Sequence, residues 1–191
     1  MSRVLVGVLG FLLLVSFAAS VHAALADSSL PVFAVAPDGT ALTAELKLHV
    51  VPGTGKIWSS VSGPLVGTAT QSTEKIAVQV AQNYFECTQS YDYFFSIDSE
   101  ASVVDGPSAG SAMTLLVIAA LQEKPIPTYV GLTGTITNEG LVGPVGGVFE
   151  KAKEAAESGV KLFLIPLGES RQVVKLAGGV QTINLPEYAL E

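Results

Sequence analysis

The spacing of apolar and polar residues along the chain predicts alternating strands and helices. Apolar side chains occupy every second position from residue 42 to residue 50, and this period of two predicts a strand with one buried face. Residues 109–121 are apolar except for Ser111 and Thr114, so they predict a helix that is buried on all sides. Interleaved helices and strands with frequent hairpins indicate an α+β fold, with mixed sheets around this buried central helix.

The same patterns, read together with the positions of glycine and proline, predict the remaining elements. Further helices are expected at residues 72–85, 148–158 and 169–177. Further strands are expected at residues 56–61, 92–98, 129–137 (a long strand), 141–145, 161–166 (a short buried strand) and 180–185, and residues 31–37 are expected to form a short strand or an extended entry segment. A hairpin turn is expected at Asn138-Glu139-Gly140, and Gly53-Thr54-Gly55 is expected to turn the chain between two strands.

The first 26 residues have the composition of a targeting segment. Arg3 precedes an apolar run over residues 4–21, and small residues continue up to Ala26. This pattern predicts a secretory signal peptide or, alternatively, a retained membrane anchor through residues 4–21. In both cases the domain is expected outside the cytoplasm, either secreted or tethered to the membrane. Residues 27–40 are expected to be a linker that leads into a single domain at residues 41–191.

Charge and residue types exclude several classes of function. The chain has a net charge of −7 and no basic cluster, so nucleic acid is not expected as a partner. Cys87 is the single cysteine, which rules out an internal disulfide, and it is expected to be a buried free thiol. Two well-separated histidines and one cysteine do not make a transition-metal site, and no metal or other cofactor is expected.

The strongest candidate for chemistry is Ser108, in the segment Gly106-Pro107-Ser108-Ala109-Gly110 at the start of the central helix. Unpaired backbone N–H groups and the helix dipole at a helix N-terminus would stabilise an oxyanion beside such a serine. Asp105 or Gly106 is expected to cap this helix. The alternative is a serine that belongs to a well-capped core helix and has no catalytic role.

Histidine is not expected to activate this serine. The α/β-hydrolase order requires a histidine after the serine, whereas His22 and His49 both precede Ser108. A trypsin-like order, with His49 ahead of an aspartate and the serine, stays open, but His49 is expected on the solvated face of its strand. If Ser108 is a nucleophile, a lysine with a lowered pKa is the next candidate for its base.

Lys151 is the lysine placed most suggestively. It lies in the first turn of the helix expected at residues 148–158. At about 100° per residue, Val148 and Ala155 lie on the buried face with Lys151 at its edge, whereas Lys153 points into solvent. Burial would lower the pKa of the Lys151 amine and populate its neutral form. The alternative is a lysine that extends from the helix edge to solvent.

Three motifs carry a resemblance to a known family. They are Asp105-Gly106-Pro107-Ser108-Ala109-Gly110, Leu132-Thr133-Gly134-Thr135-Ile136-Thr137 and Gly140-Leu141-Val142-Gly143-Pro144-Val145-Gly146-Gly147-Val148-Phe149-Glu150-Lys151. In this order and spacing they resemble the proteolytic domain of Lon proteases. The resemblance implies that Ser108 is the nucleophile and Lys151 its general base, that Thr133 orients the lysine, and that Asp105 helps to shape the nucleophile loop. It also implies a homo-oligomer, a hexameric ring.

The chain departs from that family in two places. Lon enzymes join an ATPase to this domain, and none is expected here, since Pro52-Gly53-Thr54-Gly55-Lys56-Ile57 lacks the first glycine and the Ser or Thr of a phosphate loop. Phe94-Phe95-Ser96-Ile97-Asp98-Ser99-Glu100 replaces the histidine-containing strand of many relatives, which affects the substrate groove. The resemblance therefore implies an ATP-independent serine endopeptidase acting on exported peptides or unfolded proteins. The alternative is a binding or assembly module that has kept this fold without turnover.

Overall fold

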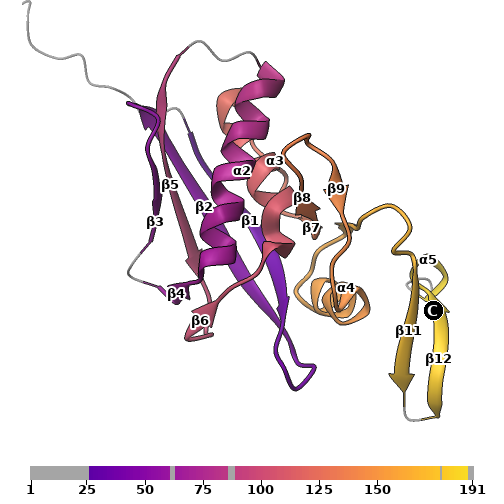
Figure 1. Cartoon of the computed structure of the whole chain (residues 1–191). Coiled ribbons are helices and arrows are strands. Elements are labelled where there is room, and N and C mark those ends of the chain that lie inside the picture. The colour runs from indigo at the N-terminus through magenta and orange to yellow at the C-terminus, as the bar shows by residue number, and fades with distance from the viewer. Residues whose placement is uncertain (1–25, 61–62, 86–88, 177, 189–191) are drawn as a thin grey trace, which may run out of the picture.

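The computed structural model describes residues 26–60, 63–85, 89–176 and 178–188 (Figure 1). The predicted targeting segment, apart from Ala26, lies outside the described residues, and so does Cys87. Within those ranges, no helix combines the length and the apolar character needed to cross a membrane.

A four-stranded sheet forms one layer of the fold. Its strands follow the order β1 (Ala26–Val35), β2 (Ala41–Pro52), β5 (Tyr91–Asp98) and β3 (Ile57–Ser59), and only the β3–β5 pair is parallel. Alternate residues of β2 and β5 are buried, as the period of two predicts. Strand β1 confirms the strand predicted at residues 31–37 over residues 31–35, but it begins earlier than predicted, since residues 26–35 pair with β2. Residues 27–30, expected to belong only to a linker or entry segment, are therefore part of the sheet, and their polar side chains concealed the start of the strand.

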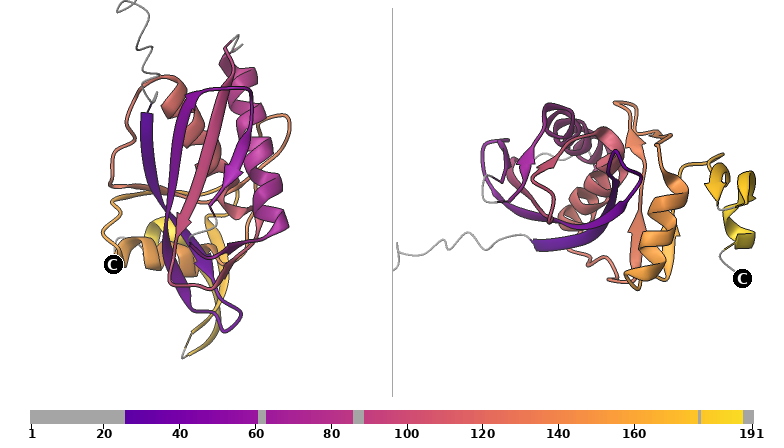
Figure 2. Two further views of the ribbon diagram at one scale, coloured as in Figure 1. Left: turned by 90° about the vertical axis from the view of Figure 1, so that its left-hand side faces the viewer. Right: turned by 90° about the horizontal axis from the view of Figure 1, so that it is seen from below.

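Two helices cover one face of the sheet (Figures 1 and 2). The central helix α3 (Gly110–Leu121) has nine buried residues out of 12, which confirms its predicted place in the core. Helix α2 (Thr68–Phe85) lies beside it and begins four residues earlier than predicted. The reason is a capping group distant in sequence, since Asp105 Oδ1 accepts hydrogen bonds from the backbone N–H groups of Ala69 and Thr70.

A second group of short elements lies against the edge of this core. It consists of β7 (Val130–Leu132), β8 (Thr135–Ile136), β9 (Val142–Gly143), α4 (Val148–Glu157) and β10 (Leu162–Leu164). Strand β7 pairs in parallel with β10, and β8 forms the predicted hairpin with β9. The long strand predicted at residues 129–137 is interrupted at Thr133 and Gly134, whose backbone groups bond to other elements. The prediction that β10 is buried is wrong, since Leu162 and Leu164 are 47% and 45% exposed.

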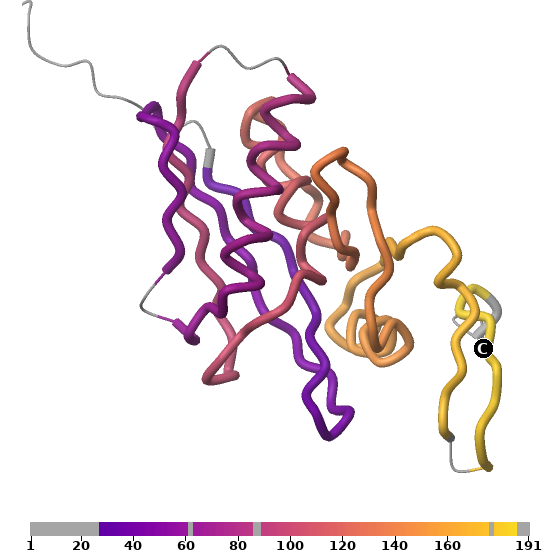
Figure 3. Tube along the Cα trace, viewed as in Figure 1, coloured from indigo at the N-terminus to yellow at the C-terminus, as the bar shows by residue number. Residues whose placement is uncertain are grey.

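The prediction of a helix at residues 169–177 is wrong, because most of this segment is a strand. Strand β11 (Arg171–Leu176) pairs there with β12 (Gly179–Asn184) in an antiparallel hairpin at the end of the molecule remote from β3, and the short α5 (Leu185–Tyr188) follows (Figure 3). Strand β12 matches the final strand predicted at residues 180–185. Val174 and Leu185 are buried against α4 in a small separate core. That contact, together with the β-branched side chain of Val174, favours a strand over the helix that the local pattern indicated.

Two further short strands, β4 (Leu65–Val66) and β6 (Val103–Val104), pair in parallel.

We expect Glu74→Gln to stabilise the fold more at about pH 8 than at about pH 4. Glu74, on α2, is 2% exposed, and burial raises the pKa of its carboxyl group although the hydroxyl of Ser59 donates a hydrogen bond to it. The folded state keeps this proton to a higher pH than the unfolded chain. The protonated Glu74 carboxyl group contributes its full stabilisation below the pKa that it has in the unfolded chain. This contribution is lost as the pH rises through the higher pKa that it has in the folded state. Thermal melting of both proteins across this range measures the difference.

The matched control is Glu123→Gln, at an exposed glutamate. Its melting temperature should follow that of the unaltered chain at each pH. An equal shift for both variants, or a Glu74→Gln gain that does not grow with pH, would contradict the role assigned to burial.

Candidate active site

Ser108 lies in a tight turn that leads directly into the central helix. Pro107, Ser108 and Ala109 form the short 3₁₀ helix η1 (Pro107–Ala109), and α3 begins at the next residue. Gly106 caps η1 with a φ of 132°, a conformation that a residue with a side chain rarely adopts. Ser108 is half-buried, and its backbone N–H group lies in the first turn, where helical N–H groups have no partner within the helix.

Asp105 holds this turn against the start of α2. Its Oδ1 atom accepts hydrogen bonds from the backbone N–H groups of Ala69 (3.0 Å), Thr70 (3.1 Å) and Gly106 (3.0 Å). The hydroxyl of Thr70 in turn donates to the Gly106 carbonyl at 3.2 Å. Asp105 therefore caps a helix other than the one predicted from sequence, while its carboxylate shapes the serine turn.

The interruption between β7 and β8 braces the other side of the turn. The backbone N–H group of Gly134 donates to the Ser108 carbonyl at 2.9 Å, and that of Ser111 donates to the Gly134 carbonyl at 3.0 Å. The Thr133 hydroxyl donates to the same Ser108 carbonyl at 3.3 Å. The Thr133 N–H group reaches β10 and donates to the Leu164 carbonyl at 3.0 Å. Sequence patterns gave no sign of the parts played by Gly134 and Leu164.

Lys151 is buried in the first turns of α4 with its amine directed at this brace. The residue is 3% exposed, and Nζ donates to Thr133 Oγ1 at 3.5 Å. Burial lowers the pKa of the amine. No ion pair with a carboxylate involves Lys151 among the residues that the structure describes. Lys153 is exposed and pairs with Glu157, so the two lysines of α4 differ as the helical spacing predicts.

Ser108 and Lys151 meet through Thr133. The Thr133 hydroxyl contacts the lysine amine on one side and the serine carbonyl on the other. Among the residues that the structure describes, no hydrogen bond joins Ser108 Oγ directly to Lys151 Nζ. The contacts shown link the amine to the backbone of the serine turn, and catalytic hydrogen bonds are often long until substrate binds.

His49 lies elsewhere. It is on the face of β2 opposite the buried Leu48 and Val50, and its Nδ1 atom bonds to Asp27 Oδ1 at 2.5 Å. This position confirms the predicted solvated face and leaves the histidine on the other side of the sheet from α3. No cluster of three or more metal-binding side chains is found across residues 26–60, 63–85, 89–176 and 178–188.

Ser108 opens onto a groove of about 370 Å³. Strand β1 and the chain around β6 form its walls, and Asp105, Gly106 and Ala109 lie beside the serine. Most of the lining side chains are apolar and none is basic; they include Val32, Phe33, Val35, Leu42, Ile97 and Val103. The groove beside Ser108 is thus a largely apolar surface, and the only charged side chain among the described residues that line it is that of Asp105.

The structure thus brings the backbone of the serine turn and the Lys151 amine together at the Thr133 hydroxyl, while His49 lies apart from them. Residues 38–184 match the family described as Lon protease (S16) C-terminal proteolytic domain, and the chain belongs to this family of peptidase domains.

Individual relatives are Lon proteases. The chain is 33% identical over 144 residues to the Lon protease of Mycoplasma mycoides subsp. mycoides SC, a match that covers 72% of this chain and 18% of the relative. It is 39% identical over 98 residues to Lon protease 2 of Bacillus subtilis, covering 51% of this chain and 18% of the relative. With the Lon protease of Clostridioides difficile it shares 34% identity over 132 residues, which cover 65% of this chain and 16% of the relative. The chain thus spans less than a fifth of the length of these relatives.

We expect Asp105→Ala to lower the free energy of unfolding by about 2 kcal/mol, because three backbone N–H groups lose their acceptor at once. Urea unfolding followed by circular dichroism measures the change. The matched control is Asp38→Ala, since Asp38 accepts one backbone hydrogen bond, from Thr40, in an exposed turn. Equal losses in the two variants would show that Asp105 does not brace the serine turn.

Proposed function

We propose that this chain is a serine endopeptidase in which Ser108 is the nucleophile and Lys151 the general base. The observation that carries the proposal is the state of the Lys151 amine. It is buried, burial lowers its pKa, and it contacts the threonine hydroxyl that also contacts the serine turn. A lysine amine in such surroundings is neutral at a lower pH than usual and can accept a proton.

The reaction follows from these positions. Neutral Lys151 takes the proton from Ser108 Oγ as the oxygen attacks a peptide carbonyl in the groove. Backbone N–H groups in the first turn of η1 stabilise the oxyanion that forms. The lysine ammonium then gives its proton to the leaving amine, and an acyl-enzyme ester on Ser108 remains. Lys151 next removes a proton from water, and hydrolysis of the ester regenerates the serine.

Thr133 and Asp105 have positioning roles in this proposal. The Thr133 hydroxyl accepts a hydrogen bond from Lys151 Nζ and donates one to the Ser108 carbonyl, which fixes the amine relative to the serine turn. Asp105 fixes the turn relative to α2. Neither side chain takes part in bond making or bond breaking.

The proposed substrates are exported peptides or unfolded proteins, cleaved without ATP. The narrow, largely apolar groove beside Ser108 supports an extended segment rather than a folded domain as the substrate. The glycine-containing turn before β3 does not resemble a phosphate site, because Asp92 Oδ1 already accepts from the N–H groups of Thr54 and Lys56. The apolar run at residues 4–21 supports a location outside the cytoplasm, secreted or tethered to the membrane.

Assembly into a homo-oligomer, a ring of six by family resemblance, belongs to the same proposal. The exposed Leu162 and Leu164 on β10 support such self-association, because exposed apolar residues often mark protein contacts. A module without turnover is the weaker candidate. It does not account for a lysine amine buried without a carboxylate partner, an arrangement that costs stability.

We expect Ser108→Ala and Lys151→Ala each to reduce cleavage of unfolded casein by at least about 10³-fold, since each removes one half of the proposed dyad. The matched control is Lys153→Ala, on the same helix but with its amine exposed, which should retain activity. Rates of fluorescent-casein cleavage, with circular dichroism to verify folding, provide the measurement. Full activity in folded Lys151→Ala would exclude the dyad.

The pH dependence tests the protonation state of Lys151. Because the neutral amine is the active form, kcat/KM should rise with pH and level off at a pH below the usual lysine pKa, since burial lowers this pKa. Thr133→Val keeps the side-chain volume but removes the hydroxyl that accepts from the amine, so the pKa of Lys151 should fall further and the rise should move to lower pH. A profile that is flat from about pH 6 to about pH 10 would contradict a lysine base.

A further inference from the structure

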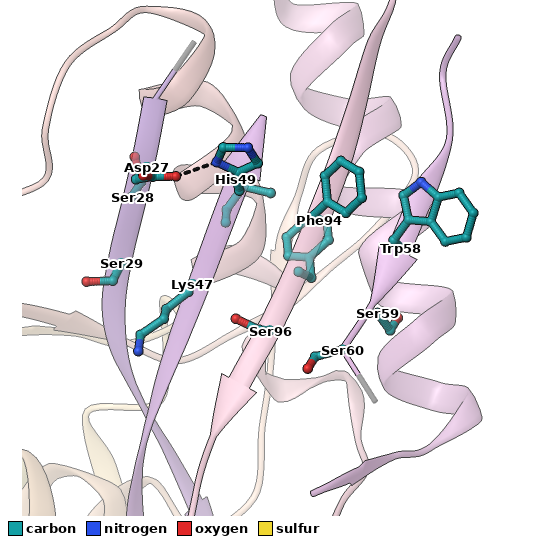
Figure 4. A pocket seen from close by; sticks show the side chains of 12 residues that line it. Asp27, Ser28, Ser29, Lys47, His49, Trp58, Ser59, Ser60, Phe94 and Ser96 are labelled. Atoms are coloured by element: carbon teal, nitrogen blue, oxygen red, sulfur yellow. Dashed lines mark hydrogen bonds and ion pairs between the residues drawn. The ribbon is translucent and has the colours of Figure 1, made fainter. Parts of the chain in front are cut away.

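The outer face of the main sheet, the face turned away from α3, holds a hollow of about 600 Å³ (Figure 4). Outward-facing residues of all four strands line it. None of them lines the groove beside Ser108 or contacts Lys151, so the proposed peptidase chemistry does not account for this surface.

A row of rings crosses the middle of this face. His49 on β2 pairs with Phe94 on β5, which pairs with Trp58 on β3. The ring centroids lie 6.0 Å apart from His49 to Phe94 and 6.1 Å apart from Phe94 to Trp58. The planes of the last two rings differ by only 5°, and Figure 4 shows the rings side by side with their faces turned the same way. We call Phe94 and Trp58 the aromatic platform.

The aromatic platform is open to solvent. Trp58 is 48% exposed and Phe94 39% exposed, although the inner face of β5 is buried. Single exposed apolar residues are ordinary, whereas two parallel rings on adjacent strands beside a hollow form a continuous exposed aromatic surface.

Short polar side chains surround the aromatic platform. Asp27 and His49 are hydrogen-bonded at one end of the ring row. The next row toward the other end of the strands carries Ser29, Lys47 and Ser96, which Figure 4 shows below the rings. These hydroxyl, carboxylate and imidazole groups can both donate and accept hydrogen bonds.

The charges on this face exclude polyanionic ligands. Lys47 Nζ is bound by Asp98 Oδ2 at 2.6 Å and Glu45 Oε2 at 3.1 Å, so its charge is compensated. Lys56 lies 6.0 Å from the Trp58 ring, and Asp27 adds a negative charge. Nucleic acids and anionic lipids require an excess of basic groups, which this surface does not have.

We propose that the aromatic platform binds a neutral saccharide chain. A sugar ring has a flat face of C–H bonds, which packs on the negative face of an aromatic ring, and an edge of hydroxyl groups. Phe94 and Trp58 accept two successive sugar units on their faces. Asp27, His49 and Ser96 lie where they can exchange hydrogen bonds with the hydroxyl groups of these units.

The experiment uses Trp58 as its own reporter, because it is the only tryptophan in the chain. The full chain is titrated with cellohexaose, maltohexaose, mannohexaose and chitohexaose while tryptophan emission is recorded. At least one of these four probes should change the emission in a saturable manner. Phe94→Ala should weaken that binding at least tenfold, whereas Tyr84→Ala, which removes an exposed aromatic ring from α2, should leave it unchanged.

Calorimetric titration extends the test to Trp58 itself. Trp58→Ala should abolish the heat of saccharide binding, and Trp58→Phe, which keeps a flat ring, should restore part of it. Circular dichroism verifies folding, and cleavage of a short peptide should not change in Phe94→Ala. These readouts separate loss of the aromatic platform from loss of the fold.

Three outcomes would overturn the proposal. The first is no saturable change with any of the four saccharides. The second is saccharide binding that Phe94→Ala and Trp58→Ala leave intact, which would place the site elsewhere. The third is a saturable change produced by unfolded casein, by a single-stranded oligonucleotide or by phosphatidylglycerol vesicles but by none of the saccharides, which would assign the surface to a different class of partner.

Discussion

The site depends on keeping one lysine amine out of water. Lys151 enters the interior without a carboxylate partner among the described residues, and the hydroxyl of Thr133 is the polar group within its reach. Burial of an unpaired amine is unfavourable, so neighbouring packing must hold α4 in place. Val148 and Phe149, in the same turns of α4 as the lysine, supply this packing. They anchor α4 in the small core that they share with Val174 and Leu185. The C-terminal hairpin thus contributes indirectly to the position of the amine.

Close backbone approach is the second requirement, and glycine allows it at two positions. A Cβ atom at Gly110 would lie 2.9 Å from the backbone nitrogen of Ile136, and one at Gly134 would lie 3.0 Å from Ser111 Oγ. The serine turn and the β7–β8 segment can therefore exchange backbone hydrogen bonds directly. The carbonyl of Ser108 accepts hydrogen bonds from both Gly134 and Thr133. A displacement of β7 or β8, which flank these two residues, would therefore move the proposed nucleophile.

Sequence patterns predicted correctly those helices and strands that bury the same face along their whole length. The apolar run of α3 and the alternation in β2 each reflect one continuous buried surface, and the helical spacing separated Lys151 from Lys153. The patterns failed where a distant group decides the local structure. Asp105 starts α2 from a position 36 residues beyond Ala69, and α4 turns residues 171–176 into a strand by covering Val174. The first residues of strand β1 were missed because they include Asp27 and two serines, which resemble a linker, whereas residues 31–35 were predicted as a strand.

The two faces of the main sheet are subject to different physical constraints. The inner face is fixed by core packing against α2 and α3, and changes there would disturb the helix that begins beside Ser108. The outer face bears no such packing in the part of the chain that the structure describes, so its residues can vary without moving the serine turn. Phe94 alternates with the buried Tyr93 and Phe95 on β5, and Asp27 and Trp58 lie on other strands of the same sheet, so one sheet positions both surfaces. Binding at the outer face would therefore leave the groove beside Ser108 open, and a chain held to a saccharide could still accept a peptide.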